Sequence, residues 1–518
     1  MNIIDCLKSY YLQKPLRCIL IVSLLLRLIA AIFAKGYGMH DDHFLIIESS
    51  GSFVDGFDYN SWLPASHYNQ GPHGHSFFYM GLHYVLFVIL NALGIVSPDV
   101  KMYVVRIIHA VYSLSVVYFG YRIANKYAGR QTALQTAWLL AAFWFMPWLS
   151  VRNLVEIQCV PFLLWGIWIY LKKDTVNLKT AVLSGLIAGI AFSVRFQSAF
   201  ILLGFALALL CLRQFKNAIA WGLAALFSML LIQSSIDFFI WGKPCVELAE
   251  YVRYNIIHAG DYLQGSSLMY VYLILGLFIP PVSMFIFWGF FVRWRKYLIL
   301  FLPCFIFLLF HSLFLNKQER FVLTVVPMVI ILGMTGWKEF ISLHSGNKRL
   351  NRFVKGSWRM FIVINTLLLC VMSVQYSKKT RVESMLYLSK YKQVEPLVKL
   401  SDVPMLPLFY LGQWVDRIDI DKDRTGSSIA ALLENGIEPR FVLLTDNKQA
   451  SQTIDSLRLY VPDLIFETKI QPGFVDKLLF SLNPFHNKNE TILIYRNQKY
   501  FKDKDCCHAD TSDNGNKE

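Results

Sequence analysis

The sequence predicts a polytopic α-helical membrane protein of about 11 spans with a small C-terminal α/β soluble domain. Three observations indicate this: 55% of the 518 residues are hydrophobic, only 16% are charged, and the mean hydropathy is +0.43. Soluble chains carry roughly 25% charged residues, so this chain cannot be mainly soluble. Its 15% aromatic content and nine cysteines also exclude a disordered chain and a disulfide scaffold.

Twelve apolar stretches approach the composition of a membrane span, which needs about 20 mostly apolar residues. They lie near residues 18–35, 76–96, 102–121, 133–149, 154–171, 180–194, 198–212, 217–233, 268–291, 297–315, 321–337 and 358–376. If all of them crossed, the basic loops after residue 121 would conflict with the positive-inside rule. The stretch 76–96 is the best one to exclude, because it follows a loop rich in His and Gly and contains His83 and Asn91. We expect it to lie in the interface or to re-enter.

With eleven spans, the basic residues divide unequally between the two sides. The predicted cytoplasmic segments hold 20 of them: Lys8, Lys14, Arg17, Arg122, Lys126, Arg130, Lys172, Lys173, Lys179, Arg213, Lys216, Arg293, Arg295, Lys296, Lys338, Lys348, Arg349, Arg352, Lys355 and Arg359. The outer segments up to residue 376 hold 7: Lys35, Arg152, Arg195, Lys243, Arg253, Lys317 and Arg320. The net charge of +15 is therefore an orientation signal with the N-terminus inside, and it does not indicate a nucleic-acid partner.

From about residue 377 the apolar runs shorten to strand length and the charge density rises. We therefore divide the chain into a membrane domain (1–376), a soluble α/β domain on the non-cytoplasmic side (377–505) and a disordered tail (506–518). In the soluble domain we predict strands at 406–411, 441–444, 464–466 and 492–495, with helices at 428–434 and 451–459. A mainly parallel sheet fits this alternation.

The first outer segment, residues 36–75, contains no Lys or Arg but several acids, among them Asp41, Asp42 and Glu48. An outer loop is acidic simply because positive charge is excluded from it, and this explanation suffices for Asp55 and Asp58. Asp41 and Asp42 differ, because they directly follow a membrane helix. The stretch 44–47 is expected to lie along the interface and to present Glu48 near them. Carboxylates at a membrane surface suit proton removal from a hydroxyl, so these three are catalytic candidates.

Five histidines fall in the same segment: His40, His43, His67, His73 and His75. Their spacing matches no zinc pattern. We therefore expect no metal ligand and no cofactor, with a divalent metal left open as an alternative. Hydrogen bonding or substrate contact is the preferred interpretation, and His40 and His43 are taken as substrate-binding candidates.

Isolated cations stand at the ends of later outer helices, at Arg152, Arg195, Lys317 and Arg320. A lone arginine at a membrane boundary is more often an interfacial anchor, and we interpret Arg152 in that way. Lys317 and Arg320 instead interrupt an apolar stretch with a short polar hinge. Cations that face an acidic loop would suit a phosphate-bearing lipid substrate, because they can stabilise the leaving phosphate. Arg195, Lys317 and Arg320 are the remaining substrate-binding candidates.

Two of these segments resemble the motifs of glycosyltransferase family 22. Residues 39–48 (Met-His-Asp-Asp-His-Phe-Leu-Ile-Ile-Glu) are similar to its first-loop motif, and residues 316–321 (Asn-Lys-Gln-Glu-Arg-Phe) are similar to its second, with Pro327 following. The outer residues Asp237, Trp241, Gly242, Lys243, Tyr254 and Asn255 also resemble a family pattern. The family's positions are matched at Asp41, Phe44, Glu48, Lys317, Arg320 and Phe321, and departures occur at Met39, His40, Asp42, Leu45, Asn316 and Gln318.

This resemblance implies a C-type (GT-C) membrane glycosyltransferase. Such an enzyme transfers a sugar, most often mannose, from a polyprenyl-phosphate donor to a hydroxyl of a glycan or glycolipid, with inversion, on the non-cytoplasmic face. Asp41 would act as the base, Asp42 and Glu48 would assist, and Arg320, Lys317 and Arg195 would hold the phosphate. The alternative is a transporter or flippase of lipid-linked sugars, which would carry internal repeats and charges along several helices. The single Asn-x-Thr sequon, at 489–491, favours a bacterial inner membrane over a eukaryotic lumen.

Overall fold

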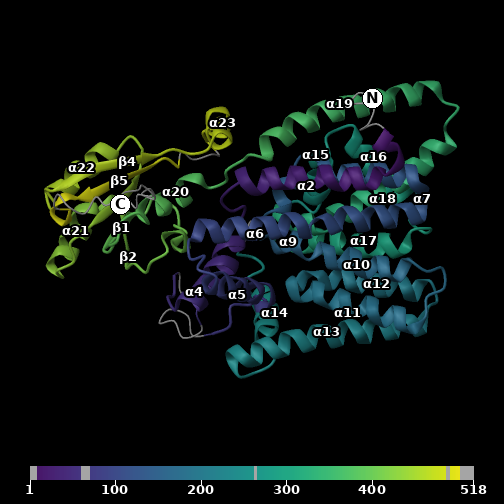
Figure 1. Ribbon diagram of the computed structural model, residues 1–518, viewed down its shortest axis with the longest axis horizontal. Coiled ribbons are helices and arrows are strands. Elements are labelled where there is room, and N and C mark those ends of the chain that lie inside the picture. Colours follow the sequence, from purple (N-terminus) through teal and green to yellow (C-terminus); the bar gives the residue numbers. More distant parts are fainter. Residues whose placement is uncertain (1–8, 60–62, 64–70, 262–264, 486–489, 502–518) are drawn as a thin grey trace, which may run out of the picture. The chain divides into compact units, whose positions relative to one another are not determined.

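The computed structural model describes residues 9–59, 63, 71–261, 265–485 and 490–501. Contacts divide the chain into two compact units, Met1–Ser377 and Lys378–Glu518. The first unit is helical and the second holds a five-stranded sheet (Figure 1). The predicted fold class is therefore confirmed. The tail predicted to be disordered, 506–518, lies outside the described residues.

The described part of the first unit is built from helices. They are α2 (Pro15–Phe33), α3 (His40–His43), α4 (Ser49–Asp55), α5 (Phe77–Ala92), α6 (Pro98–Tyr112), α7 (Leu114–Ala142), α8 (Met146–Ser150), α9 (Val155–Gln158), α10 (Val160–Leu171), α11 (Leu178–Val194), α12 (Ala199–Cys211), α13 (Phe215–Trp241), α14 (Val246–Ile257), α15 (Met269–Leu277), α16 (Val282–Val292), α17 (Leu298–Leu313), α18 (Val326–Leu343) and α19 (Lys348–Met372). A π-helix at Phe44–Glu48 and a 3₁₀-helix at Glu319–Thr324 complete the segments that matter below.

Each predicted apolar stretch contains helix, and the multi-pass membrane architecture is confirmed. Among the described residues, five helical runs are long and apolar enough to cross a membrane: Pro15–Phe33, Pro98–Ala142, Phe215–Trp241, Val326–Leu343 and Lys348–Met372. Shorter apolar helices of 10–17 residues account for the rest. The run Pro98–Ala142 reverses at Gly129, whose φ of 75° is costly for residues with a side chain. α5 is apolar and 16 residues long, and its exclusion as a span stays a prediction.

The stretch 268–291 is not one continuous helix, because the structure has two helices there; that it crosses once stays a prediction. α15 ends at Leu277 and α16 begins at Val282. Pro280 and Pro281 lie between them, and a proline lacks the N–H that a continuing helix would need. The apolar composition of the whole stretch conceals this break.

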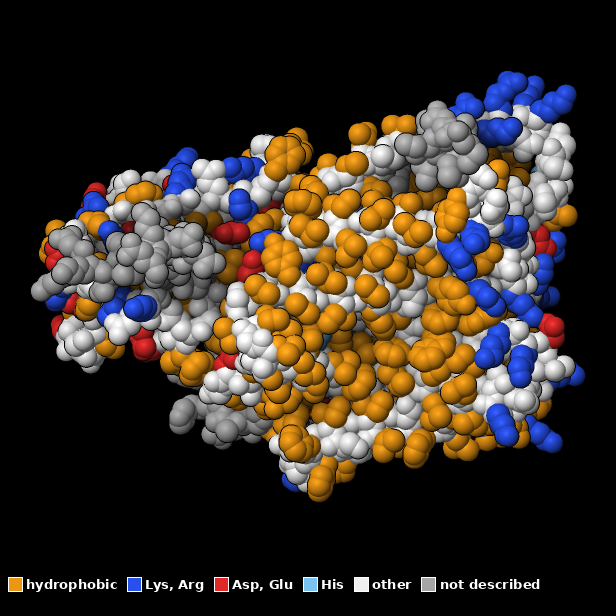
Figure 2. Space-filling view, viewed as in Figure 1, with side chains coloured by type: hydrophobic (Ala, Val, Ile, Leu, Met, Phe, Trp, Pro, Cys, Tyr) orange, Lys and Arg blue, Asp and Glu red, His pale blue; other side chains and the backbone are white. Residues whose placement is uncertain are grey.

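The outer surface of the first unit reflects its membrane environment. Hydrophobic side chains cover the sides of the helices, and Lys and Arg gather at one end of the bundle (Figure 2). The apolar covering includes highly exposed side chains such as Leu82, Leu223, Phe239 and Ile362. Such a surface would be unfavourable in water, but it suits contact with lipid.

Close helix packing inside the bundle depends on small residues. α16 and α18 pack together where Gly289 faces Gly333 and Gly336, and a Cβ atom at Gly289 would overlap the carbonyl oxygen of Gly333. Glycine at such positions lets two membrane helices approach closely. The contact holds α18, whose N-terminal end follows the 3₁₀-helix at Glu319–Thr324.

We expect Gly289→Leu to lower the thermal unfolding midpoint of the purified protein, because the two backbones must separate to admit the side chain. Overpacking typically costs about 1–3 kcal/mol. Gly222→Leu is the matched control, since nothing lies within 4 Å of a Cβ there and α13 is also an apolar helix. Equal midpoints for the two variants, measured in the same detergent, would contradict close packing at Gly289.

The second unit is a mixed sheet flanked by helices. Its elements are α20 (Lys379–Leu388), β1 (Leu397–Leu400), β2 (Arg417–Ile420), α21 (Thr425–Glu434), β3 (Phe441–Thr445), α22 (Ala450–Arg458), β4 (Leu464–Ile470), α23 (Phe474–Leu482) and β5 (Ile492–Asn497). The strand order is β2-β1-β3-β5-β4. β1 pairs in parallel with β2 and β3, while β5 pairs antiparallel with β3 and β4.

Two predictions for this unit are corrected. The sheet is mixed rather than mainly parallel, because β5 returns between β3 and β4. The predicted strand at 406–411 is instead a 3₁₀-helix at Leu408–Leu411. Its consecutive apolar residues are all buried, and a fully buried apolar run does not distinguish strand from helix. The strands predicted at 441–444, 464–466 and 492–495 are confirmed as β3, β4 and β5.

Candidate active site

A cavity of about 570 Å³ lies in the first unit where several loops and helix ends meet. Six separate segments contribute to its wall: residues 39–46, 73–76, 154–156, 194–197, 251–255 and 316–321. Both segments singled out by the sequence motifs, 39–48 and 316–321, contribute lining residues. The cavity therefore unites stretches of chain that lie nearly 300 positions apart.

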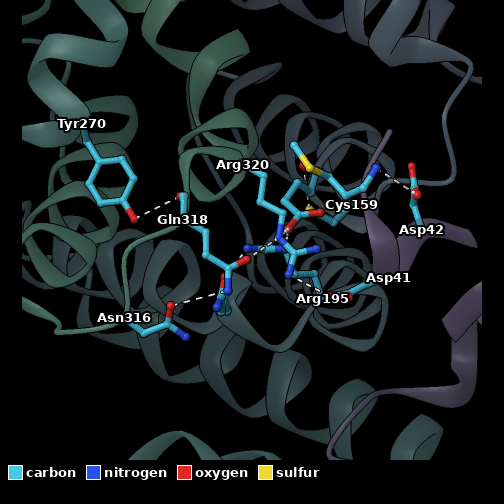
Figure 3. Close-up of polar contacts among 11 residues, drawn as sticks. Asp41, Asp42, Cys159, Arg195, Tyr270, Asn316, Gln318 and Arg320 are labelled. Atoms are coloured by element: carbon cyan, nitrogen blue, oxygen red, sulfur yellow. Dashed lines mark hydrogen bonds and ion pairs between the residues drawn. The ribbon is translucent and has the colours of Figure 1, made fainter. Parts of the chain in front are cut away.

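Asp41 and Arg320 meet directly in this cavity. Arg320 Nη2 donates to Asp41 Oδ2 over 2.6 Å, and Arg320 Nε donates to Gln318 Oε1 over 2.8 Å. Figure 3 shows the guanidinium of Arg320 between these two side chains. Asp41 comes from α3 and Arg320 from the 3₁₀-helix at Glu319–Thr324. The Asp41 side chain is 35% exposed, so its carboxylate is held by an arginine yet reachable from the cavity.

Glu156, at the start of α9, binds two arginines at once. Its Oε1 forms an ion pair with Arg195 Nη1 and lies 3.5 Å from Arg320 Nε. The carboxylate is almost fully buried. A buried carboxylate between two guanidiniums stabilises both positive charges in one place. The sequence interpretation did not identify Glu156 as a site residue. Its acidic side chain directly before an apolar helix was the available signal.

The cavity thus gathers two guanidiniums, from Arg195 and Arg320, and two paired carboxylates, from Asp41 and Glu156. Each guanidinium thus faces at least one carboxylate. An anionic ligand could displace one carboxylate and take over its arginine. The site is therefore suited to exchange an internal anion for one that arrives with a substrate.

The pKa of Asp41 is lowered from its ordinary value. Burial by itself would raise this pKa, but the positive charge of Arg320, the electrostatic effect of His75 and the hydrogen bond from Arg320 outweigh burial. Asp41 is therefore ionised at neutral pH, as a proton acceptor must be.

Asp42 has a different environment from its neighbour. Its carboxylate accepts hydrogen bonds from the backbone N–H groups of Gly38 (3.0 Å) and Met39 (3.1 Å), and it is buried. Burial raises the pKa of Asp42 to about 6. The side chain closes the turn that begins α3, so it shapes the loop that carries Asp41.

Of the other candidates in the first loop, one lines the cavity and two do not. His40 lines the cavity and stacks on Phe44, with ring centroids 4.4 Å apart. His43 and Glu48 are fully buried behind the cavity wall, with His43 Nε2 3.7 Å from Glu48 Oε1. Neither is among the cavity residues in the described part of the chain.

The expectation that residues 44–47 lie along the membrane interface is wrong. Phe44, Leu45, Ile46 and Ile47 are all buried in a π-helix that packs against α4 and α5. Four consecutive apolar side chains leave no polar face to meet water, so burial inside the protein is favoured. This is why Glu48 is carried away from Asp41.

The residues of the second motif, 316–321, do not all line the cavity. Arg320 lines the cavity together with Asn316, Gln318, Glu319 and Phe321. Lys317 is not among the lining residues described; it is buried, and its Nζ donates to the carbonyl oxygen of Phe314 over 2.5 Å. Arg195, from the end of α11, does line the cavity and hydrogen-bonds Gln197. The structure thus brings together Arg195 and Arg320, but not Lys317.

Arg152 is a structural tie inside the first unit, not a membrane-facing anchor. Its Nη1 donates to the carbonyl oxygens of Lys35 (3.1 Å) and Gly36 (2.6 Å), and its Nη2 donates to that of Gln375 (3.4 Å). The side chain is buried. Arg152 therefore fixes the start of the loop that leads to Asp41.

The loop with His73, Gly74 and His75 forms another part of the cavity wall, and Glu247 holds it in place. The Glu247 carboxylate accepts hydrogen bonds from all three backbone N–H groups, over 3.3, 2.7 and 3.1 Å. It also accepts one from the Trp241 indole over 2.9 Å. Burial raises the pKa of Glu247 to about 7. The sequence interpretation did not identify this residue.

The contacts of Glu247 with this loop explain part of the outer family pattern noted in the sequence, which begins at Asp237. Asp237 accepts a hydrogen bond from the backbone N–H of Glu247 over 3.0 Å, at the start of α14. One face of α14 supplies Tyr251, Tyr254 and Asn255 to the cavity. Asp237 and Trp241 therefore position the loop indirectly, while Tyr254 and Asn255 face the cavity.

We expect Glu247→Ala to destabilise the protein, because three loop N–H groups lose their acceptor and each unsatisfied group costs about 1–3 kcal/mol. Hydrogen exchange at Gly74 and His75 should accelerate. Glu250→Ala, one turn along α14, is the matched control, since its carboxylate pairs with the exposed Arg253 and holds none of these three N–H groups. Unchanged protection of both amides in Glu247→Ala would contradict a role of Glu247 in holding the loop at residues 73–75.

The histidines do not assemble a metal site in the parts of the chain that the structure describes, where no group of three or more His, Cys, Asp or Glu side chains could hold an ion. His67 lies outside the described residues. Independence of a metal or cofactor stays a prediction. Of the remaining histidines, His73 and His75 line the cavity with His40.

The sequence profile of the Alg9-like mannosyltransferase family matches residues 18–400. No curated protein matches the sequence.

Solved structures show the same fold at low identity. The crystal structure of ArnT from Cupriavidus metallidurans bound to undecaprenyl phosphate is 15% identical, with a TM-score of 0.60, over 93% of this chain and 97% of that one. The Archaeoglobus fulgidus oligosaccharyltransferase with Zn and sulfate is 13% identical, with a TM-score of 0.54, over 84% and 69%. Mycobacterial arabinofuranosyltransferase AftD is 12% identical, with a TM-score of 0.51, over 94% and 40%. These are GT-C glycosyltransferases, and the GT-C fold is shared.

Proposed function

Because the chain belongs to the Alg9-like mannosyltransferase family and is therefore a glycosyltransferase, we propose that its cavity transfers mannose from a polyprenyl-phosphate donor to a hydroxyl of a glycan or glycolipid. The observation that carries the proposal is the contact between Asp41 and Arg320 beside Arg195 and Glu156. It provides a proton acceptor and two phosphate-binding cations within one cavity. The family supports an enzyme over the flippase alternative.

Asp41 is the base in this proposal. It takes the proton of the acceptor hydroxyl while that oxygen forms a bond to the anomeric carbon. The bond from this carbon to the phosphate oxygen breaks, and its electron pair leaves with the polyprenyl phosphate. Because attack comes from the face opposite the phosphate, the configuration inverts. The leaving phosphate is already a weak base, so no general acid is required.

Arg320 and Arg195 hold the phosphate in this scheme. Positive groups fixed where negative charge develops stabilise the transition state most in a site with little water. Arg320 is bound to Asp41 before the donor arrives, so donor phosphate takes Arg320 and frees Asp41 for the acceptor. Asp42 shapes the loop, and His40 is available for substrate contact. Lys317 and Glu48 have no direct part.

We propose that the cavity opens on the non-cytoplasmic face. α11 begins next to the basic loop at 172–179 and ends at Arg195 in the cavity, while α17 begins after the basic loop at 293–296 and ends just before Asn316. Each helix thus has a basic loop at one end and the cavity at the other. Basic loops favour the cytoplasm. This supports a cytoplasmic N-terminus, and we retain a bacterial inner membrane as the location.

The proposal is tested with the full-length enzyme in nanodiscs, supplied with polyprenyl-phosphate mannose, polyprenyl phosphates bearing other sugars, or GDP-mannose, and with a panel of glycolipid acceptors. We expect transfer from the polyprenyl-phosphate mannose, and a product whose anomeric configuration, determined by NMR, is opposite to that of the donor. Transfer from GDP-mannose without a lipid donor, or retention of configuration, would contradict the proposal.

A further inference from the structure

The connection between β4 and β5 is far longer than the sheet requires. The two strands are antiparallel neighbours, and Ile470 at the end of β4 pairs with Ile492 at the start of β5. A hairpin of this kind is usually closed by about two to five residues. The chain instead uses residues 471–491 and places the helix α23 among them. A long insertion at a simple hairpin indicates a role other than closing the sheet.

α23 exposes an apolar face. Phe474, Leu478 and Leu482 recur at every fourth position, so they lie along one side of the helix. They are 74%, 43% and 72% exposed, and no residue of α23 is buried. Hydrophobic side chains gather over this helix in the space-filling view (Figure 2). Apolar side chains left in water are unfavourable, and the second unit by itself leaves these three largely uncovered.

A short linker joins the second unit to a helix that can cross a membrane. α19, which is long and apolar enough to cross one, ends at Met372, and the second unit begins at Lys378. A linker of residues 373–377 spans at most about 18 Å when extended. The first residue of the second unit is therefore tethered within about this distance of the end of a helix that can cross a membrane.

We propose that α23 is an interfacial helix whose apolar face inserts into the lipid headgroup region and anchors the second unit to the bilayer. An apolar stripe bordered by charged residues is typical of helices that lie in the membrane plane. Here Asp476 and Lys477 border the stripe, and Lys477 is exposed. The lysine is long enough to reach lipid phosphates while the apolar side chains face the acyl boundary.

The test uses photo-crosslinking in the full-length protein, reconstituted in nanodiscs of phosphatidylethanolamine and phosphatidylglycerol. Benzoylphenylalanine replaces Phe474 or Leu482 in two variants, and Ser456, which is exposed on α22, in the control. After irradiation, mass spectrometry measures lipid adducts. We expect adducts severalfold above the control at both positions, and a loss of the adduct at residue 474 when Leu478→Glu is added.

Two outcomes would overturn the proposal. Lipid adducts at residues 474 and 482 that do not exceed those at residue 456 would exclude insertion. Crosslinks to a second protein chain in place of lipid would identify the face as a protein interface. Because all three probe positions are on the surface of the second unit, the sugar-transfer activity of each variant serves as a check of folding.

Discussion

Replacement of Asp41 by asparagine is expected to reduce sugar transfer by about 100- to 10,000-fold, the range that a general base contributes. Asparagine preserves the size of the side chain but cannot take a proton. Polyprenyl-phosphate binding should persist or tighten, because Arg320 no longer has to break its ion pair with Asp41 before it binds phosphate. The measurement is the initial rate of mannose transfer at saturating donor and acceptor, together with donor affinity.

The matched control for Asp41→Asn is Asp261→Asn. Asp261 is exposed, pairs with His258 and is not among the cavity residues described. It should leave the transfer rate and the unfolding midpoint unchanged. Wild-type activity in a correctly folded Asp41→Asn variant would exclude Asp41 as the base and would direct attention to Asp42, the other first-loop carboxylate that lines the cavity.

Arg320→Ala is the second change with a large expected effect. Removal of one donor that stabilises developing negative charge typically costs about 100- to 1,000-fold in rate. Weaker donor binding should accompany this loss, because hydrogen bonds to charged groups contribute about 1.5–3 kcal/mol. The deletion also removes one of the two arginine contacts of Glu156 and keeps the one with Arg195. Rate and donor affinity, measured separately, would reveal both effects.

Arg320→Lys and Arg253→Ala complete this experiment. Lysine keeps the charge but cannot reproduce the planar, multiple-donor geometry of arginine, so we expect partial activity. Arg253 is exposed and pairs with Glu250 on α14, and its removal should have little effect. Arg320→Ala with wild-type donor affinity would mean that the phosphate binds elsewhere.

Sequence composition predicted the membrane fold well, because lipid imposes a simple requirement on every spanning helix. Long apolar runs such as α2 and α19 are recognisable without any knowledge of packing. The break between α15 and α16 was missed although Pro280 and Pro281 marked it, since an average over a long apolar window hides a local stop. The strand β5 was predicted, but its antiparallel pairing between β3 and β4 was not, because strand order depends on contacts between distant segments.

The candidate site, too, was predicted only in part. Motif resemblance brought Asp41 and Arg320 to attention, and the structure pairs them. Proximity in sequence failed for Glu48 and Lys317, because side chains a few residues apart on one segment can point in different directions. Both are buried, and neither is among the described residues that line the cavity. Glu247 could not have been found from spacing. Its function depends on three backbone N–H groups that belong to a loop more than 170 residues earlier.

The exchange of Arg320 between Asp41 and the donor phosphate is the central claim, and a cryo-EM structure of the full-length enzyme in nanodiscs with bound polyprenyl phosphate tests it most directly. We predict phosphate within hydrogen-bond distance of the Arg320 and Arg195 guanidiniums. The Asp41 carboxylate should then be separated from Arg320 and open to the cavity. Phosphate bound outside the cavity, or an Asp41–Arg320 contact still at 2.6 Å beside bound phosphate, would contradict the account.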